Sequence, residues 1–408
     1  MRILMISSTF PYPPSRGGTE IRTFNLLKYL NLRHDVTLVT QRQKGVSDSD
    51  VEELRKWASN LVVFTQADKI ETKKSIDVKG KVGRFLESLI KMTPPNVLYR
   101  YSEAMQGWID EFVREGKCEA IACEHSVSEI YIRPQFRQQV RTIINIHSSV
   151  SGWIRNQLEV GASPNPWRDR LYLALLLEKY EKRYSEKFNY LVVTTEDDKN
   201  QFLKLNPRAN IEVIPNGVDL DLFPYRREDP GGEQIVFVGA MDASHNIDAV
   251  RFFALEILPV LQKRYTSATF RIIGARPTKA VLELAKRPGI TVTGEVPAIA
   301  PELHRATVCV VPLRVGYGIK NKTLEAMAAG VPVVASDRGL EGIKIETSEG
   351  LAALRANQIP EYIEALTRLF ENPELRQQLS KNGRSLVEKE YTWEQIGQRY
   401  EKLLLHAK

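Results

Sequence analysis

The most informative part of the sequence is Cys309-Val-Val-Pro-Leu-Arg-Val-Gly-Tyr-Gly-Ile-Lys-Asn-Lys-Thr-Leu-Glu-Ala-Met-Ala-Ala-Gly-Val-Pro-Val-Val-Ala335. The pattern predicts a buried strand, a loop with two glycines, a helix from Asn321 to the stop at Gly330, and a second buried strand. Apolar strands joined through helices are typical of a parallel sheet with both faces covered. We therefore expect an α/β protein.

The same alternation of strands and helices fills the rest of the chain. In the first half the apolar runs predict strands at 2–7, 35–40, 61–64, 119–123, 142–146 and 190–194. In the second half they predict strands at 234–238, 270–273, 290–293, 308–311 and 331–335. The Pro-Asn-Gly turn within 214–219 separates the halves. Two doubly wound, Rossmann-like domains are expected, with a small ligand in the cleft between them, beyond the carboxyl ends of the strands.

Composition excludes several classes of protein. The 408 residues are 43% hydrophobic and 26% charged, which excludes a disordered tail, a collagen and a disulfide-rich miniprotein. Cys118, Cys123 and Cys309 are too scattered for a disulfide framework or a zinc site, so we expect free thiols. The apolar stretch in Met1–Ser8 is too short for a signal peptide, and Leu171–Leu177 is too short to span a bilayer. We expect a soluble, cytoplasmic protein.

The net charge is +7, which favours anionic partners, and most of it lies in one segment. Residues 69–100 contain eight basic residues against the acidic Glu71, Asp77 and Glu87. Among the charges lie the apolar Phe85, Leu86, Leu89, Ile90 and Met92, at nearly helical spacing. Two interpretations stay open: a solvated surface segment, and a patch that docks the protein peripherally on the anionic inner face of a membrane. No nucleic-acid partner is expected.

The loop and helix of the opening stretch suit a diphosphate. Gly316 and Gly318 allow the backbone to approach a ligand closely. The helix that starts near Asn321 offers free N–H groups and its positive dipole end to the same ligand. Glu325, one turn further, is placed to accept a sugar hydroxyl. Three cations lie within nine residues, namely Arg314, Lys320 and Lys322. The alternative is an ordinary surface loop with solvated lysines.

These residues resemble the donor-site signature of the retaining GT-B glycosyltransferases of the group 1, or GT4-type, family. In that family a Glu precedes Ala-Met-Ala-x-Gly-x-Pro-Val-Val, as Glu325 does here. Further resemblances follow in order along the chain: a phosphate loop at Gly17-Gly18, an interdomain linker at 214–223, the opening of the nucleotide domain at 236–248, and the start of a C-terminal helix at Tyr391-Thr-Trp393.

The resemblance implies an organisation and a reaction. Residues 1–213 would bind the acceptor, residues 214–390 would bind the nucleotide sugar, and residues 391–408 would form a helix that packs back towards the first domain. The enzyme would move a hexosyl group, with retention, from a nucleoside-diphosphate sugar to a saccharide or lipid-linked saccharide in polysaccharide or glycolipid synthesis. No cofactor or metal is expected, because Asp219 and Asp221 lie in the linker. A GT-B epimerase or phosphorylase, and a non-catalytic sugar-nucleotide-binding protein, remain alternatives.

The resemblance also implies a donor site, with two departures from the family pattern. The residues expected to bind the donor are Gly17, Gly18, Gly239, Asn246, Glu295 (near the base), Arg314, Tyr317, Gly318, Ile319, Lys320, Asn321, Lys322 and Glu325. Tyr317 stands where many members have a Glu that contacts the sugar. The loop at 239–246 lacks the usual Arg and Lys, and His245 would be its only cation if protonated. Arg314, Lys320 and Lys322 are expected to substitute, with the two lysines stabilising the leaving diphosphate.

Two histidines follow strands of the first domain. His147 follows the strand at 142–146 and is expected to be catalytic, through a hydrogen bond to the donor or through help in deprotonating the acceptor. His125 has the same position after the neighbouring strand, and Arg155 is a candidate contact to acceptor or phosphate. Structural histidines that cap their strands are the alternative.

Overall fold

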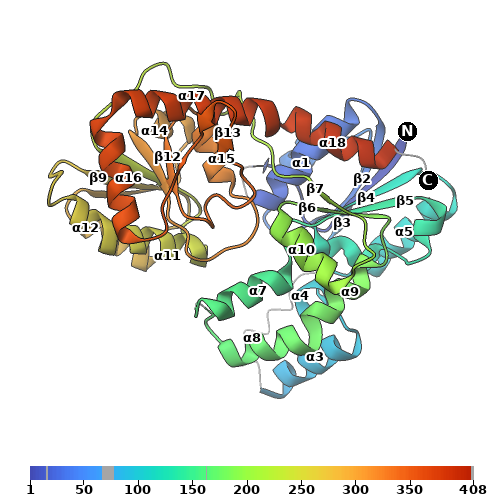
Figure 1. The fold of residues 1–408 in the computed structure, drawn as a ribbon. Coiled ribbons are helices and arrows are strands. Elements are labelled where there is room, and N and C mark those ends of the chain that lie inside the picture. The colour runs from blue at the N-terminus through green and yellow to red at the C-terminus, as the bar shows by residue number, and fades with distance from the viewer. Residues whose placement is uncertain (15–16, 67–77, 162, 406–408) are drawn as a thin grey trace. The chain divides into compact units, whose positions relative to one another are not determined.

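The computed structural model describes residues 1–14, 17–66, 78–161 and 163–405. Contacts divide the chain into two compact units, which we call unit 1 (Met1–Pro215 with Ile396–Lys408) and unit 2 (Asn216–Gln395). Each unit is built around a parallel sheet with helices on both faces (Figure 1). The predicted α/β class with two doubly wound sheets is confirmed.

Unit 1 contains, among its described residues, a seven-stranded parallel sheet in the order β3-β2-β1-β4-β5-β6-β7. Its strands are β1 (Arg2–Ser7), β2 (Asp35–Arg42), β3 (Asn60–Thr65), β4 (Ala120–Glu124), β5 (Arg141–Asn145), β6 (Tyr190–Val193) and β7 (Ile211–Val213). Its covering helices include α1 (Gly18–Asn31), α2 (Asp48–Arg55), α5 (Glu103–Arg114), η2 (Ser126–Tyr131), α6 (Phe136–Gln139), α9 (Glu178–Ser185) and α10 (Glu196–Leu205). Six of these strands were predicted, and the short β7 was not.

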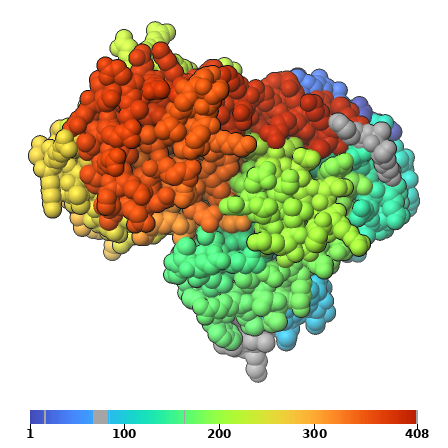
Figure 2. Space-filling model, viewed as in Figure 1, coloured from blue at the N-terminus to red at the C-terminus, as the bar shows by residue number. Residues whose placement is uncertain are grey.

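A helical lobe extends unit 1 beside α9 (Figure 1). It consists of α3 (Val78–Ile90), α4 (Pro95–Leu98), α7 (Val150–Glu159), α8 (Pro166–Tyr172) and the π-helical η3 (Leu173–Leu177). Residues of α7 and α8, in green, form much of the lobe surface in Figure 2, with α3 in blue beside them. On α3 the side chains of Leu86 and Ile90 are 50% and 83% exposed.

The predicted basic segment lies partly in this lobe. Its residues 69–77, with Lys69, Lys73 and Lys74, lie outside the described residues. Phe85 packs with its ring 5.0 Å from that of Tyr172, so one apolar face of α3 is turned towards α8. Within the described ranges, none of the helices has the length and apolar composition to cross a bilayer.

Unit 2 contains, in the described part of the chain, a six-stranded parallel sheet in the order β10-β9-β8-β11-β12-β15. Its strands are β8 (Gln234–Val238), β9 (Thr269–Ile273), β10 (Ile290–Gly294), β11 (Val308–Val311), β12 (Val333–Ala335) and β15 (Leu354–Arg355). Its main helices are α11 (Ser244–Phe252), α12 (Leu258–Leu261), α14 (Ala300–His304), α15 (Asn321–Ala328), α16 (Ile359–Glu371) and α17 (Pro373–Glu390). In both sheets the winding direction reverses beside the first strand, so a ligand site is expected there.

The last helix, α18 (Trp393–Leu405), packs on unit 1 from Ile396 onward. Gly397 lies against the ring of Tyr29 so closely that a β-carbon would approach ring atoms to 2.2–2.6 Å. The Tyr29 hydroxyl also donates to Glu401 Oε2 over 3.0 Å, and His34 Nε2 lies 2.6 Å from Glu401 Oε1. These contacts attach α18 to α1.

A fully buried polar network holds residues 214–215, just before the boundary between the units, against the rest of unit 1. Arg22 of α1 donates through Nη1 to the Pro215 carbonyl over 2.6 Å and through Nη2 to the Ile214 carbonyl over 2.9 Å. Its Nε donates to Asn145 Oδ1. Asn145 Nδ2 and the Tyr400 hydroxyl donate to the two carboxylate oxygens of Glu124, over 2.8 and 2.9 Å. Burial lowers the pKa of Arg22 to about 10 and raises the pKa of Glu124. The network therefore joins α1, β4, β5 and α18 of unit 1 to residues 214–215.

Candidate functional site

The strand order of unit 2 reverses between β8 and β11, and several predicted residues meet at the carboxyl ends of these strands. Gly239 follows β8 directly, and a β-carbon there would lie 2.7 Å from both Asn246 Nδ2 and Lys322 Nζ. Only glycine therefore leaves room for these two side chains beside the strand end. The structure brings Gly239, Asn246 and Lys322 together, as a shared donor site requires.

Lys322 lies in the first turn of α15. Its Nζ donates to Asn246 Oδ1 over 2.5 Å and lies 4.2 Å above the ring of Phe237. Burial, together with the neighbouring charge of Lys320, lowers the pKa of Lys322 to about 7. Among the described residues no carboxylate forms an ion pair with it. An anion bound here would raise the pKa of Lys322 and so stabilise the charged form of its amine.

Glu325 lies one turn further along α15 and is half-buried. Burial raises the pKa of Glu325 to about 7, although the charge of Lys322 lowers it. The Lys322 amine and the Glu325 carboxyl thus titrate as a coupled pair near neutral pH. A carboxylate and an ammonium three residues apart present an acceptor and a cation at the start of one helix.

Lys320 and the glycine loop are held by Glu341, which the sequence analysis did not identify. The Gly318 N–H donates to Glu341 Oε1 over 3.0 Å, and Lys320 Nζ lies 3.7 Å from Glu341 Oε2. Lys320 Nζ also donates to the Gly318 carbonyl. At Gly316 and Gly318 φ is 129° and 78°, conformations that favour glycine. The loop after β11 is therefore shaped by glycines and clamped by a buried carboxylate.

Arg314 is not part of the group around Lys322. Its guanidinium forms a two-bond ion pair with Asp248 of α11, Nε to Oδ2 over 3.0 Å, and lies 4.7 Å over the ring of Phe252. Its charge is therefore compensated within the protein. Tyr317 is half-buried, and the Arg338 guanidinium lies 5.7 Å over its ring.

The remaining predicted donor residues surround the same edge of the sheet. Asn321 Oδ1 accepts from Asn216 Nδ2 over 2.7 Å, which ties the linker to the start of α15. Ile319 is buried in the loop, and Glu295 is exposed after β10. Burial lowers the pKa of His245 to about 4. His245 is therefore neutral at pH 7 and adds no cation to this loop, because Lys322 and Lys320 also disfavour its charged form.

The Asp-x-Asp pair of the linker has a local structural role. Asp219 Oδ1 accepts the backbone N–H groups of Asp221 and Leu222 over 2.9 and 3.3 Å. Such a contact is typical of an Asx turn.

In unit 1 the structure brings His125 and His147 together after β4 and β5. Their rings are 5.0 Å apart and nearly perpendicular. His125 Nδ1 accepts the Val127 N–H over 3.3 Å, and its backbone has φ of 66°, a strained conformation typical of functional positions. Burial lowers the pKa of His125 to about 4 and that of His147 well below its ordinary value. Both rings are therefore neutral at pH 7.

The loop that carries His147 is held by two buried carboxylates that the sequence did not reveal. His147 Nε2 is buried and has no hydrogen-bond partner among the described residues. Downstream, Asp198 accepts the Ser149 N–H over 2.8 Å, and Glu181 accepts the Val150 N–H over 2.7 Å. These carboxylates fix the start of α7 and hence the position of His147.

Two further predictions in unit 1 have different environments. Gly17 is the N-cap of α1, where its carbonyl accepts the Ile21 N–H, and Gly18 has open space around it. Arg155 donates to Gln201 and Glu178, so its guanidinium ties α7 to α9 and α10. No described contact brings Arg155 to the two histidines.

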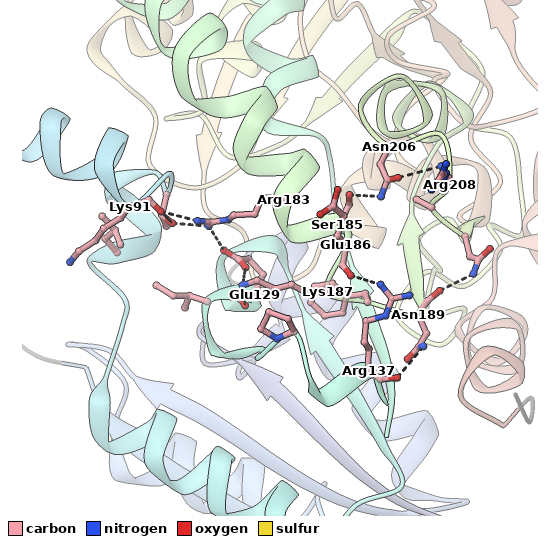
Figure 3. Close-up of a pocket in the computed structure, with 17 residues that line it drawn as sticks. Lys91, Glu129, Arg137, Arg183, Ser185, Glu186, Lys187, Asn189, Asn206 and Arg208 are labelled. Carbon is pink, nitrogen blue, oxygen red and sulfur yellow. Dashed lines mark hydrogen bonds and ion pairs between the residues drawn. The ribbon is translucent and has the colours of Figure 1, made fainter. Parts of the chain in front are cut away.

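A separate pocket of about 900 Å³ lies at the opposite end of the unit 1 strands, where Asn189 and Asn210 precede β6 and β7 (Figure 3). Several of its charged groups bond to one another or to backbone carbonyls. Lys187 Nζ donates to Glu129 Oε2 over 2.5 Å, and Arg137 Nη1 donates to the Glu186 carbonyl. None of the predicted site residues lines this pocket.

Comparison with known proteins gives matches over both units. The model of the family described as "Glycosyltransferase Family 4" matches residues 16–222, and that of "Glycosyl transferases group 1" matches residues 232–372. Lipopolysaccharide 1,2-N-acetylglucosaminetransferase of Salmonella typhimurium is 28% identical over 231 residues, which cover 50% of this chain and 59% of that relative.

Solved structures with the same fold cover nearly the whole chain. Sucrose-phosphate synthase from Thermosynechococcus elongatus has a TM-score of 0.69 at 20% identity, covering 99% of this chain and 98% of that one. Anabaena HepE in complex with UDP and glucose has a TM-score of 0.65 at 13% identity, covering 100% of both chains. These likenesses confirm the predicted GT-B fold.

Proposed function

Because this chain belongs to glycosyltransferase family 4, we propose that it transfers a hexosyl group from a nucleoside-diphosphate sugar to a saccharide or lipid-linked saccharide. We propose that transfer proceeds with retention, without a metal, in the synthesis of a cell-surface polysaccharide or glycolipid. The Salmonella relative, named as an N-acetylglucosaminetransferase, and the HepE complex with UDP support a sugar-nucleotide donor.

One observation carries the proposal: Gly239, Asn246 and Lys322 converge where the strand order of unit 2 reverses. A diphosphate there would accept hydrogen bonds from the backbone N–H groups of Asn321 and Lys322, which begin α15 and precede the first N–H that bonds to the N-cap carbonyl, that of Thr323. It would also replace the neutral Asn246 oxygen as the partner of Lys322. Glu325, one turn on, would accept hydroxyls of the ribose.

The chemistry requires stabilisation of the leaving group. As the bond from the sugar to the diphosphate breaks, negative charge develops on the phosphate oxygens. Lys322 and the positive end of α15 would stabilise this charge, and Lys320, held by Glu341, would keep the loop in place. Because Asp248 neutralises Arg314, we propose no leaving-group role for that arginine.

Unit 1 would supply the acceptor side of the reaction. His147 and His125 lie together after β5 and β4, and both rings are neutral at pH 7 because burial lowers each pKa. A neutral ring can hold a hydroxyl through one hydrogen bond without adding charge. We propose that His147 Nε2, which lacks a described partner, takes this role in catalysis.

The Glu325→Ala variant should separate nucleotide binding from turnover. Loss of a charge-assisted hydrogen bond to the ribose is expected to weaken nucleoside-diphosphate binding by about 10- to 100-fold, with kcat at saturating donor nearly unchanged. Calorimetric titration and steady-state kinetics measure the two effects. The control Glu346→Ala alters an exposed carboxylate of unit 2 and should change neither. Unchanged binding in Glu325→Ala would contradict the ribose assignment.

For the basic segment we propose contact with an anionic membrane surface. The wild type should sediment with phosphatidylglycerol-containing vesicles, and changing Lys73, Lys74, Lys79 and Lys81 to Gln should lower partitioning at least about tenfold. The matched control changes four exposed lysines of unit 2 to Gln, namely Lys263, Lys286, Lys381 and Lys389. An equal loss of vesicle partitioning in both variants would mean that net charge alone controls binding, and it would refute the proposal that the basic segment docks on the membrane.

A further inference from the structure

A second pocket of unit 1, of about 480 Å³, lies beside His125. Its walls come from η2, α4, α7, α8, η3 and α9, and they are mostly apolar, with Val97, Val127, Ile154 and Leu177 among them. Its volume is in the range of small-molecule sites. The pocket of Figure 3 is lined by many charged residues, whereas the acidic and basic residues in this lining are Arg168 and Asp169, which pair with each other over 2.9 Å.

His125 is one of the polar residues that line this pocket. Because His125 Nδ1 accepts the Val127 N–H, the neutral ring carries its proton on Nε2 and can donate a hydrogen bond from there. His147, the proposed catalytic histidine, lies against the His125 ring. The pocket therefore pairs an apolar interior with a hydrogen-bond donor next to the proposed reaction site.

The apolar wall continues towards the outer surface of the lobe. Tyr172 lines the pocket and packs against Phe85 of α3. On the same helix Leu86 and Ile90 are exposed, so apolar side chains extend from the pocket to the surface of the lobe. A fully hydroxylated sugar would leave its hydroxyls unpaired against these side chains, and burial of unpaired polar groups is unfavourable.

We propose that this pocket holds an alkyl chain attached to the acceptor sugar, so that the acceptor is a glycolipid whose polar head reaches His125. The inference rests on the proposed transferase function and adds the class of acceptor. Each methylene buried by the pocket should raise affinity about three- to fourfold. A chain that fills the pocket should therefore dominate binding of the acceptor.

The probes that test this are octyl β-glucoside, below its micelle concentration, and methyl β-glucoside. The full-length protein should bind the octyl compound at least about tenfold more tightly, as measured by calorimetry and ligand-observed NMR. Val150→Asn and Ile154→Asn, both at partly exposed lining positions of α7, should each abolish most of this preference. Val160→Asn makes the same kind of change at an exposed position outside the pocket and should leave the preference intact.

Two results would overturn the inference: equal binding of the two glucosides, or equal damage from Val160→Asn and Ile154→Asn. UDP binding by every variant, measured in the same samples, checks that unit 2 is folded and tests the donor site separately. If octyl glucoside binds as expected while no nucleoside diphosphate binds, the transferase function fails and the assignment of the pocket to an alkyl chain survives. If UDP binds but the octyl preference is absent, the glycolipid assignment alone fails.

Discussion

Lys322→Met is expected to lower kcat/KM for sugar transfer by about 10²- to 10³-fold, the usual effect of removing one group that stabilises a developing oxyanion. Methionine keeps a side chain of similar length and removes the ammonium that lies over Phe237, together with its hydrogen bond to Asn246 Oδ1. The matched control is Lys344→Met, at an exposed position of the same unit, which should retain wild-type kinetics. Equal kinetics for the two variants would contradict the donor site.

The pH dependence of nucleotide affinity tests the role of Lys322 in a second way. In the free protein burial lowers the pKa of Lys322 to about 7, and a bound diphosphate should raise it towards its ordinary value. Binding then takes up a proton, so nucleotide affinity should fall as the pH rises above about 7. Glu325 should have the opposite effect on the pH dependence of nucleotide binding. A carboxylate that accepts ribose hydroxyls must lose the proton it holds below about pH 7, so binding at Glu325 releases a proton.

The Glu325→Gln variant removes this opposing titration. In that background, calorimetry in buffers of different ionisation enthalpy should show net proton uptake at pH 7.5. Adding Lys322→Met should eliminate the uptake. Net proton release in Glu325→Gln would contradict the assignment of Lys322 to the diphosphate.

Arg22→Met is expected to destabilise unit 1 by about 3–5 kcal/mol, because it leaves the buried Glu124 carboxyl without its nearby cation. It also removes the donors for the carbonyls of residues 214–215. Urea unfolding monitored through unit 1 measures the loss. Arg114→Met, which breaks an exposed ion pair with Glu111, should cost less than about 1 kcal/mol.

The pH profile identifies the cause of that loss. Without Arg22 the pKa of Glu124 should rise further, so the folded state of the variant should hold a proton that the unfolded state has lost at neutral pH. The difference in unfolding free energy between Arg22→Met and wild type should therefore shrink as the pH falls from 7 towards 5. Arg22→Met combined with Glu124→Gln should recover part of the stability at pH 7. A deficit that is independent of pH and unchanged in the double variant would refute the electrostatic explanation.

The strands could largely be predicted from the sequence because buried parallel strands are apolar on both faces. The run at 308–311 is one such strand, and the structure has β11 there. Strand β7 was missed because Ile211-Glu-Val is short and carries a charge. Its pairing with β6 makes it a strand, and that is a tertiary contact.

The local part of the candidate site was also predictable, because Gly318, Asn321 and Glu325 are close together in sequence and form one loop and one helix. The residues that contact this loop and helix from distant parts of the sequence could not be predicted. Arg314 was expected at the diphosphate, yet it pairs with Asp248, 66 positions away. Glu341 clamps the loop without any motif around it. Such contacts depend on which strands are neighbours in the sheet, and the spacing of residues in the sequence does not contain that information.

The proposed transfer depends on binding of a nucleoside diphosphate at Lys322 of unit 2, and calorimetric titration with UDP, GDP and ADP, without added metal, measures that binding. We expect one of these diphosphates to bind the wild type and Lys344→Met with equal affinity, and to bind Lys322→Met at least about tenfold more weakly, since a charge-assisted contact is lost. Absence of binding by all three diphosphates, or equal affinity for wild type and Lys322→Met, would refute the donor site.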